Sequence, residues 1–231
     1  MHFILDGIKK GIELIITLDS EVLTILKLSL LISITATIIA VLVGVPLASI
    51  IALKKFPLKK IAIAGINTGM GLPPVVVGLI VTLFLARHGP LGFLQWLYTA
   101  KGMIVAQIVI ATPIITGLSL AAVQSIEHKF YLQILSLGAT SCQALWVLLR
   151  EIRLSILAAV IAGFGSIISE VGAVMMVGGN IKGQTRVLTT AVVLETNMGN
   201  FDIAIALGLI LLAMSFIVNL ALTYIQQKKI R

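Results

Sequence analysis

The chain has 231 residues, of which 59% are hydrophobic and 11% are charged, with a formal net charge of +8. A soluble globular domain is about half apolar and about a quarter charged, so the composition excludes an ordinary soluble domain. The gaps between the apolar blocks are too short to hold a domain with a basic face, so the net charge does not indicate nucleic-acid binding.

Residues 1–20 are interrupted by charges and predict a short amphipathic lead-in rather than a membrane span. They lack the basic, apolar and small-residue order of a cleavable signal peptide. Cys142 is the only cysteine, which excludes an internal disulfide, and no cluster of Cys and His residues indicates a metal site.

Five apolar blocks follow, and each is long enough to cross a hydrocarbon layer of ~30 Å as a helix. They are residues 28–53, 61–86, 103–126, 154–177 and 203–225. They are continuous rather than alternating, so they favour helices over a β-barrel. The first run, 22–53, corresponds to ~48 Å of helix. It must therefore tilt, project beyond the bilayer or break near Gly44 and Pro46.

Pro73 and Pro74 stand about midway along the second block. Two adjacent prolines remove two backbone donors, so they predict a kink. Freed carbonyls at membrane depth need partners or water, which places the kink against protein or a pore rather than lipid. A packing kink without ligand contact is the alternative.

Residues 127–150 form a basic, amphipathic interruption between the third and fourth blocks. Apolar residues recur at helical spacing from Phe130 to Leu137, Gly138 offers a turn, and a second apolar helix begins near Leu145. The pattern predicts a helix, a glycine and another helix at the membrane surface. It is also consistent with an interfacial elbow that rests on lipid, with Gly138 as a plain helix C-cap.

Glu170 lies near the outer end of the fourth block, where an ionisable group is costly unless it is hydrated or paired. A gate or an inter-subunit contact is one interpretation. Direct contact of this carboxylate with a dianion is disfavoured, because the two charges repel. We favour a structural hydrogen bond to the backbone or to the turn at 178–186.

Residues 178–200 are predicted to form an external loop with a short helix over 187–196. Gly178 and Gly179 free backbone N–H groups to form an anion-binding concavity, to which Asn180, Thr185 and Arg186 add donors. The alternative is an ordinary exposed loop that docks another protein.

The distribution of basic residues predicts the orientation, because they concentrate on the cytoplasmic side. Five spans place the termini on opposite sides, with ten basic residues on the carboxy-terminal side and six on the other. The ten are Lys54, Lys55, Lys59, Lys60, Lys129, Arg150, Arg153, Lys228, Lys229 and Arg231, and the six are Lys9, Lys10, Arg87, Lys101, Lys182 and Arg186. The amino terminus is therefore expected outside and the carboxy terminus in the cytoplasm.

Several motifs carry a resemblance to a known family. "SLGATSCQAL", residues 136–145, resembles the cytoplasmic loop of ATP-binding-cassette importer permeases. "GLPPVVVGL" at 71–79 and "ATPIITG" at 111–117 resemble molybdate and tungstate permeases. "ISEVGA", "MVGGNI" and "TRVLTTA", within 162–196, look like the tungstate branch. Arg150 and Glu151 stand where most members carry Leu-Pro, a departure that fits that branch.

The resemblance, over roughly residues 20–225, implies an all-α polytopic protein with five transmembrane helices, similar to type I importer permeases, in a prokaryotic cell membrane. It implies a single permease domain over 1–231, acting as a homodimer on a separate ATPase and receiving tungstate from an extracytoplasmic oxyanion-binding protein. A coupling helix within 127–150 would contact the ATPase. The residues it implies for coupling are Ile134, Leu135, Leu137, Gly138, Ala139 and Thr140, and our pathway or gate candidates are Pro73, Pro74, Glu170, Gly178, Gly179, Asn180, Thr185 and Arg186.

The chain contains no Gly-Lys dipeptide, so it lacks a phosphate-binding loop of the GxxxxGK[ST] type. We therefore expect no enzymatic activity and no cofactor in this chain, with ATP and Mg²⁺ bound by the partner ATPase. A permease for molybdate, sulfate or phosphate stays open as an alternative, as does an ATPase-independent anion channel or secondary transporter. A membrane enzyme is disfavoured because the histidines, His2, His88 and His128, are scattered.

Overall fold

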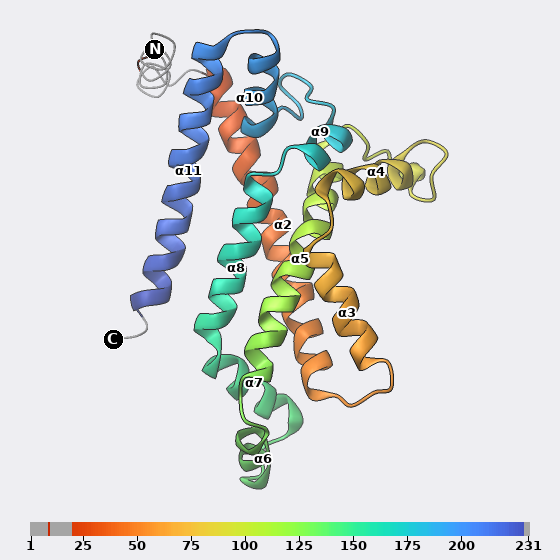
Figure 1. Ribbon diagram of the computed structural model, residues 1–231, viewed down its shortest axis with the longest axis vertical. Coiled ribbons are helices and arrows are strands. Elements are labelled where there is room, and N and C mark those ends of the chain that lie inside the picture. Colours follow the sequence, from red (N-terminus) through yellow and green to blue (C-terminus); the bar gives the residue numbers. More distant parts are fainter. Residues whose placement is uncertain (1–8, 10–19, 229–231) are drawn as a thin grey trace.

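The computed structural model describes residue 9 and residues 20–228, and within this part all regular elements are helices (Figure 1). The lead-in predicted for residues 1–20 lies outside the described residues, apart from Lys9 and Ser20. Helices α2 (Ser20–Leu53), α5 (Ala100–Gln124) and α11 (Phe201–Lys228) are long and apolar enough to cross a membrane. With two bent helix pairs each taken as one span the total reaches five, which agrees with the prediction.

Helix α2 continues through Pro46 without a break, so the long first run does not divide there. It packs along α5 through a face of small residues, which lets the two backbones approach closely. A Cβ added to Gly44 would lie 2.9 Å from Thr116 Oγ1 on α5. The buried small residues of this face are Ser29, Ser33, Ala36, Ala40, Gly44 and Ala48.

The second span is not the single kinked helix that we predicted over 61–86. It consists of α3 (Lys59–Met70) and α4 (Pro74–Leu85), which meet at 102°. Pro73 is extended, with φ −62° and ψ 123°, because the following proline disfavours a helical conformation at this position. Pro74 then begins α4 at a position where a missing N–H costs nothing.

The fourth span also differs from the continuous helix predicted over 154–177. Helices α8 (Arg153–Ile168) and α9 (Gly172–Gly178) meet at 59°. Two side chains at the break compete with helix continuation by bonding to nearby backbone. Ser169 Oγ donates to the Gly165 carbonyl at 3.0 Å, and Glu170 Oε1 accepts from the Ala173 N–H at 3.0 Å.

The remaining elements are a 3₁₀ turn, η1 (Gly92–Leu94), and helices α6 (His128–Ser136), α7 (Ser141–Glu151) and α10 (Leu188–Asn197). Helix α10 confirms the short helix predicted over 187–196. In Figure 1, α6 and α7 lie at the end of the molecule toward which the carboxyl end of α11 points, and α9 and α10 lie toward the other end.

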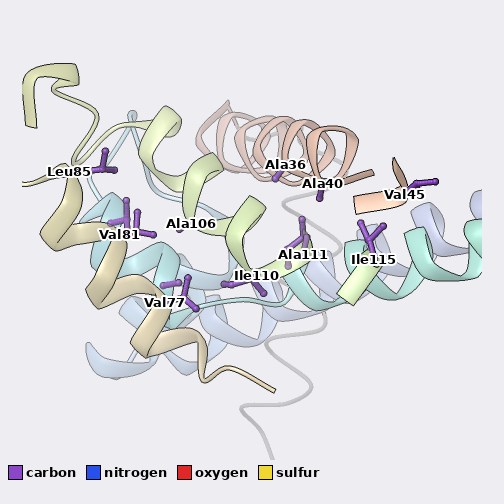
Figure 2. Packing of buried hydrophobic residues seen from close by; sticks show 13 residues of the cluster. Ala36, Ala40, Val45, Val77, Val81, Leu85, Ala106, Ile110, Ala111 and Ile115 are labelled. Atoms are coloured by element: carbon purple, nitrogen blue, oxygen red, sulfur yellow. The ribbon is translucent and has the colours of Figure 1, made fainter. Parts of the chain in front are cut away.

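The main core lies where α4, α5 and α2 meet. Figure 2 shows Val77 and Val81 of α4 gathered with Ile110 of α5, and Ala36 and Ala40 of α2 close to the same helix. Ile167 of α8 and Ala173 and Val177 of α9 complete this cluster. The core therefore joins both broken spans to the unbroken pair α2–α5.

Candidate coupling surface and transport pathway

The end of α6 and the turn that leads into α7 form an exposed apolar tip, residues 132–140, that we call the coupling tip. Leu137 is 88% exposed and Leu132 is 50% exposed, whereas Ile134, Leu135 and Ala139 are half-buried. Large apolar side chains at a surface mark a site of contact with a partner or with lipid.

The turn of the coupling tip is fixed by its backbone. Gly138 has φ +89°, a region that side-chain-bearing residues rarely adopt, and its N–H donates to the Leu135 carbonyl at 3.0 Å. Thr140 caps α7: its Oγ1 accepts from the Gln143 N–H at 3.3 Å, and its N–H donates to Gln143 Oε1 at 2.8 Å. The predicted order of helix, glycine turn and helix is confirmed.

The coupling tip is joined to the spans through a second apolar cluster. Ala122 and Val123 at the end of α5 pack with Leu148 of α7 and with Ile152. Lys59 Nζ donates to the Ala52 carbonyl at 2.7 Å and closes the carboxyl end of α2. A displacement of α7 therefore acts directly on the ends of the two central helices.

The break in the second span opens into a cavity of about 270 Å³. Pro73 and Pro74 line it, so both predicted pathway residues border an open space. Ile110 and Ile114 of α5 form its apolar wall, and Ser166 of α8 adds a hydroxyl. We call this space the break cavity.

The two broken spans contact each other through their short halves. A Cβ added to Gly78 of α4 would lie 2.7 Å from Ala173 Cα of α9. Similarly, a Cβ on Gly172 would lie 2.8 Å from Val75 Cγ2. The position of α9 is therefore tied to that of α4 and to the break cavity beside it.

Glu170 lies within the break between α8 and α9, where its carboxylate accepts the Ala173 N–H. Its carbonyl accepts from Thr189 Oγ1 of α10 at 3.0 Å. The favoured interpretation, a structural hydrogen bond to backbone, agrees with this geometry, although the partner is α9 rather than the turn at 178–186.

The outer turn, residues 178–186, is held largely by its own hydrogen bonds. Gly179 and Asn180 have φ +71° and +51°. The buried Thr185 Oγ1 donates to the Gly178 carbonyl at 2.6 Å and accepts from the Ile181 N–H at 2.9 Å. The Ile181 carbonyl in turn accepts from the N–H groups of residues 184–186. The Gly179 N–H also donates to the Met175 carbonyl, at 2.9 Å, so the predicted concavity requires another conformation of this turn and stays a prediction.

The basic residues of the outer turn face an acidic partner at the start of α2. Lys182 Nζ lies 2.7 Å from Glu21 Oε2, and Arg186 Nη1 lies 3.5 Å from Glu21 Oε1. The Arg186 side chain is only 16% exposed. Its two-pronged contact with an oxyanion stays a prediction, and it requires Arg186 to leave Glu21.

The structure thus separates the predicted residues into three places: the coupling tip, the break cavity, and the outer turn with the α8–α9 break. Ser166, Thr189 and Glu21 were not predicted as site residues. Their roles depend on partners far away in the sequence, and a single serine, threonine or glutamate carries no pattern that reveals such a partner.

Comparison with known proteins supports one family. The binding-protein-dependent transport system inner membrane component family matches residues 40–231. The chain belongs to this family. It is a multi-pass membrane protein and a transport component rather than an enzyme.

Two relatives match most of the chain. A protein named tungstate uptake system permease protein TupB, from Peptoclostridium acidaminophilum, is 40% identical over 99% of this chain and 100% of its own length. A probable anion ABC transporter permease protein from Haloferax volcanii is 40% identical over 85% of this chain and 87% of its own length.

A solved structure shares the fold. It is a bacterial alginate ABC transporter in complex with an alginate pentasaccharide-bound periplasmic protein. One of its chains superposes with a TM-score of 0.77 at 19% identity, over 93% of this chain and 82% of that one. The predicted all-α architecture of a type I importer permease is therefore confirmed.

Proposed function

We propose that this chain is the permease subunit of an ATP-driven tungstate importer. A separate ATPase energises it from the cytoplasm, and an extracytoplasmic binding protein delivers the oxyanion. The observation that carries the proposal is the coupling tip: an apolar turn, 88% exposed at Leu137, that is joined to the ends of the central helices through Leu148. The full-length similarity to a tungstate permease supports the choice of ion.

The break cavity suits passage rather than tight capture of an anion. Pro73, Pro74, Ile110 and Ile114 line it together with the hydroxyl of Ser166, and no charged side chain is among its described lining residues. A site without a fixed cation holds a dianion weakly, and transport requires that the ion leave. Selection of the ion then falls to the binding protein.

The proposed homodimer is supported by the exposed face of α3. Ala64, Gly65, Asn67 and Thr68 are all exposed there. The exposed residues of α3 also include Ile61, but those of α11 include many more large apolar side chains, such as Phe216 and Leu220. Lipid favours large apolar side chains, whereas small residues favour helix contact and an amide favours protein or water. We therefore place α3 toward a second copy and the pathway between them.

The orientation that we propose has the coupling tip in the cytoplasm and the amino terminus outside. In Figure 1, the loop between α2 and α3 lies at the same end of the molecule as α6 and α7. Lys54 and Lys55 in this loop and Lys60 at the start of α3 are exposed. Positive residues concentrate on the cytoplasmic side, which supports this choice.

The proposal is tested by reconstituting the chain in proteoliposomes with the ATPase and the binding protein that co-purify with it. We expect ATP-dependent uptake of tungstate, and none by the chain alone. Preference for molybdate, sulfate or phosphate would correct the ion, and uptake without the ATPase would contradict the proposed mechanism.

A further inference from the structure

The break between α8 and α9 is held from two other helices. Gln107 of α5 donates its Nε2 to the Ile167 carbonyl in the last turn of α8 at 3.1 Å, beside the Glu170 N–H, which donates to the same carbonyl at 3.2 Å. Thr189 of α10 donates to the Glu170 carbonyl. The Ile167 and Glu170 carbonyls at the break thus accept hydrogen bonds from side chains of α5 and α10. Buried backbone carbonyls need such donors where a helix is interrupted.

Gln107 differs from other polar residues of α5 in reaching another helix. Thr112 and Thr116 donate to carbonyls within α5, whereas the Gln107 amide crosses to α8. Gln107 is only 4% exposed, and its Oε1 accepts no hydrogen bond from the groups that the structure describes. A buried unpaired acceptor is costly, so this oxygen calls for a partner.

A small void beside Gln107 offers room for that partner. Its volume is about 10 Å³, and Ser33, Glu170 and Thr189 line it together with Gln107. About 10 Å³ is the space of one water molecule, which needs two to four polar partners. The residues that line this void carry an amide, hydroxyl groups and a carboxylate.

We infer that Gln107 is a positioning residue for the broken fourth span: its Nε2 holds the end of α8 directly, and its Oε1 binds one buried water in this void. The inference rests on the proposed function for its consequence in transport. Helix α9 contacts α4 at Ala173 and Gly78, and α4 borders the break cavity. Holding the α8–α9 junction in place therefore keeps α9 packed against α4. Loss of the Gln107 bonds loosens the end of α8 at the break, and so weakens the hold on the start of α9, while the coupling tip stays intact.

The first test measures the break itself, in the complete transporter in lipid nanodiscs. Gln107→Met keeps the length of the side chain and removes both polar groups. We expect amide hydrogen exchange over residues 169–175 to accelerate about tenfold. Thr112→Val is the matched control, since its lost bond lies within α5. Unchanged exchange in Gln107→Met would overturn the inference.

The second test separates positioning from general damage. In proteoliposomes, we expect Gln107→Met to lower tungstate taken up per ATP hydrolysed several-fold while ATP hydrolysis continues. Thr189→Val should do the same, and Thr189→Ser, which keeps the hydroxyl donor, should restore the ratio. Equal losses of uptake and hydrolysis, or no rescue by Thr189→Ser, would indicate a purely structural role and contradict the inference.

The water is tested by a high-resolution cryo-electron microscopy map of the transporter. Density within hydrogen-bond distance of Gln107 Oε1 supports the site, and a dry void at that resolution overturns it. If the wild-type transporter imports no tungstate but exchange still rises in Gln107→Met, the proposed function fails and the role of Gln107 at the break stands.

Discussion

Substitution of Gly138 by valine tests whether the coupling tip acts through its turn. The glycine has φ +89°, and an added Cβ would meet nothing within 4 Å. The Cβ of a valine at this position therefore has no steric clash, and the substitution costs free energy only through the positive φ of the backbone. A β-branched residue in that region costs ~1–2 kcal/mol. This lowers the population of the observed turn about 5–30-fold.

The consequence should be confined to coupling. Because the tip contacts the spans through residues beyond the turn, such as Leu148, we expect Gly138→Val to insert and fold normally. Retention of the ATPase and ATP-driven uptake should each fall by roughly that factor of 5–30. Gly138→Asn should retain most activity, because asparagine tolerates positive φ better than other residues.

The assay is co-purification of the ATPase, followed by uptake in proteoliposomes at equal permease content. Gly165→Val on α8 is a useful control, because an added Cβ there also meets nothing within 4 Å and its φ is not positive. Full ATPase retention and full uptake by Gly138→Val would refute the argument that this turn is the coupling element.

Three further predictions address the contacts around these sites. Gly78→Ala places a Cβ 2.7 Å from Ala173 Cα, so overpacking should lower the free energy of unfolding by ~1–3 kcal/mol. The thermal unfolding midpoint in detergent should fall accordingly. Gly208→Ala is the control and should leave the midpoint unchanged, because its Cβ meets nothing within 4 Å. Leu137→Asp should abolish ATPase co-purification without changing the midpoint, because the side chain is 88% exposed in this chain. Thr140→Ala removes the cap of α7 and should cost ~1 kcal/mol, seen as faster amide exchange in the first turn of α7.

The spans were predictable because apolar blocks of bilayer length have one dominant explanation. The helix, glycine turn and helix at 127–150 were predictable for a similar reason, since helical spacing ends at Gly138 and begins again after it. The cost of unsatisfied backbone in lipid and the freedom of glycine are both local properties. Both properties affect the local structure in the same way in any fold, so the sequence alone is enough to predict their effect.

The breaks were only partly predictable. Pro73 and Pro74 predicted a kink, but the 102° angle between α3 and α4 depends on the packing of α4 against α9. The sequence does not show that these two helices are in contact. The fourth span has no proline near its break. There, Ser169 and Glu170 bond to nearby backbone, and the sequence does not show whether a serine or a glutamate makes such a bond.

The predicted anion site at the outer turn depends on whether its donors are free, which the sequence alone does not show. Gly178, Gly179, Thr185 and Arg186 have the right chemistry, and the prediction rested on that chemistry. In the folded chain, Thr185 bonds to Gly178, and Arg186 faces Glu21, which lies 165 positions earlier in the sequence. A donor can bind an anion only if no acceptor of the protein already binds it. For Arg186 that acceptor is Glu21, which belongs to another helix, α2.

The close contacts divide the molecule into a stiff part and a part that can move. Helices α2 and α5 approach so closely at Gly44 that a single added Cβ would lie 2.9 Å from Thr116 Oγ1, and α5 meets α8 equally closely at Gly163 and Ile115. Close packing resists small displacements and transmits them. The two breaks are the places where a span changes direction, by 102° between α3 and α4 and by 59° between α8 and α9. A push at the coupling tip is therefore expected to travel along α5 and α8 as rigid rods and to change angles at the breaks, next to the cavity through which the ion is proposed to pass.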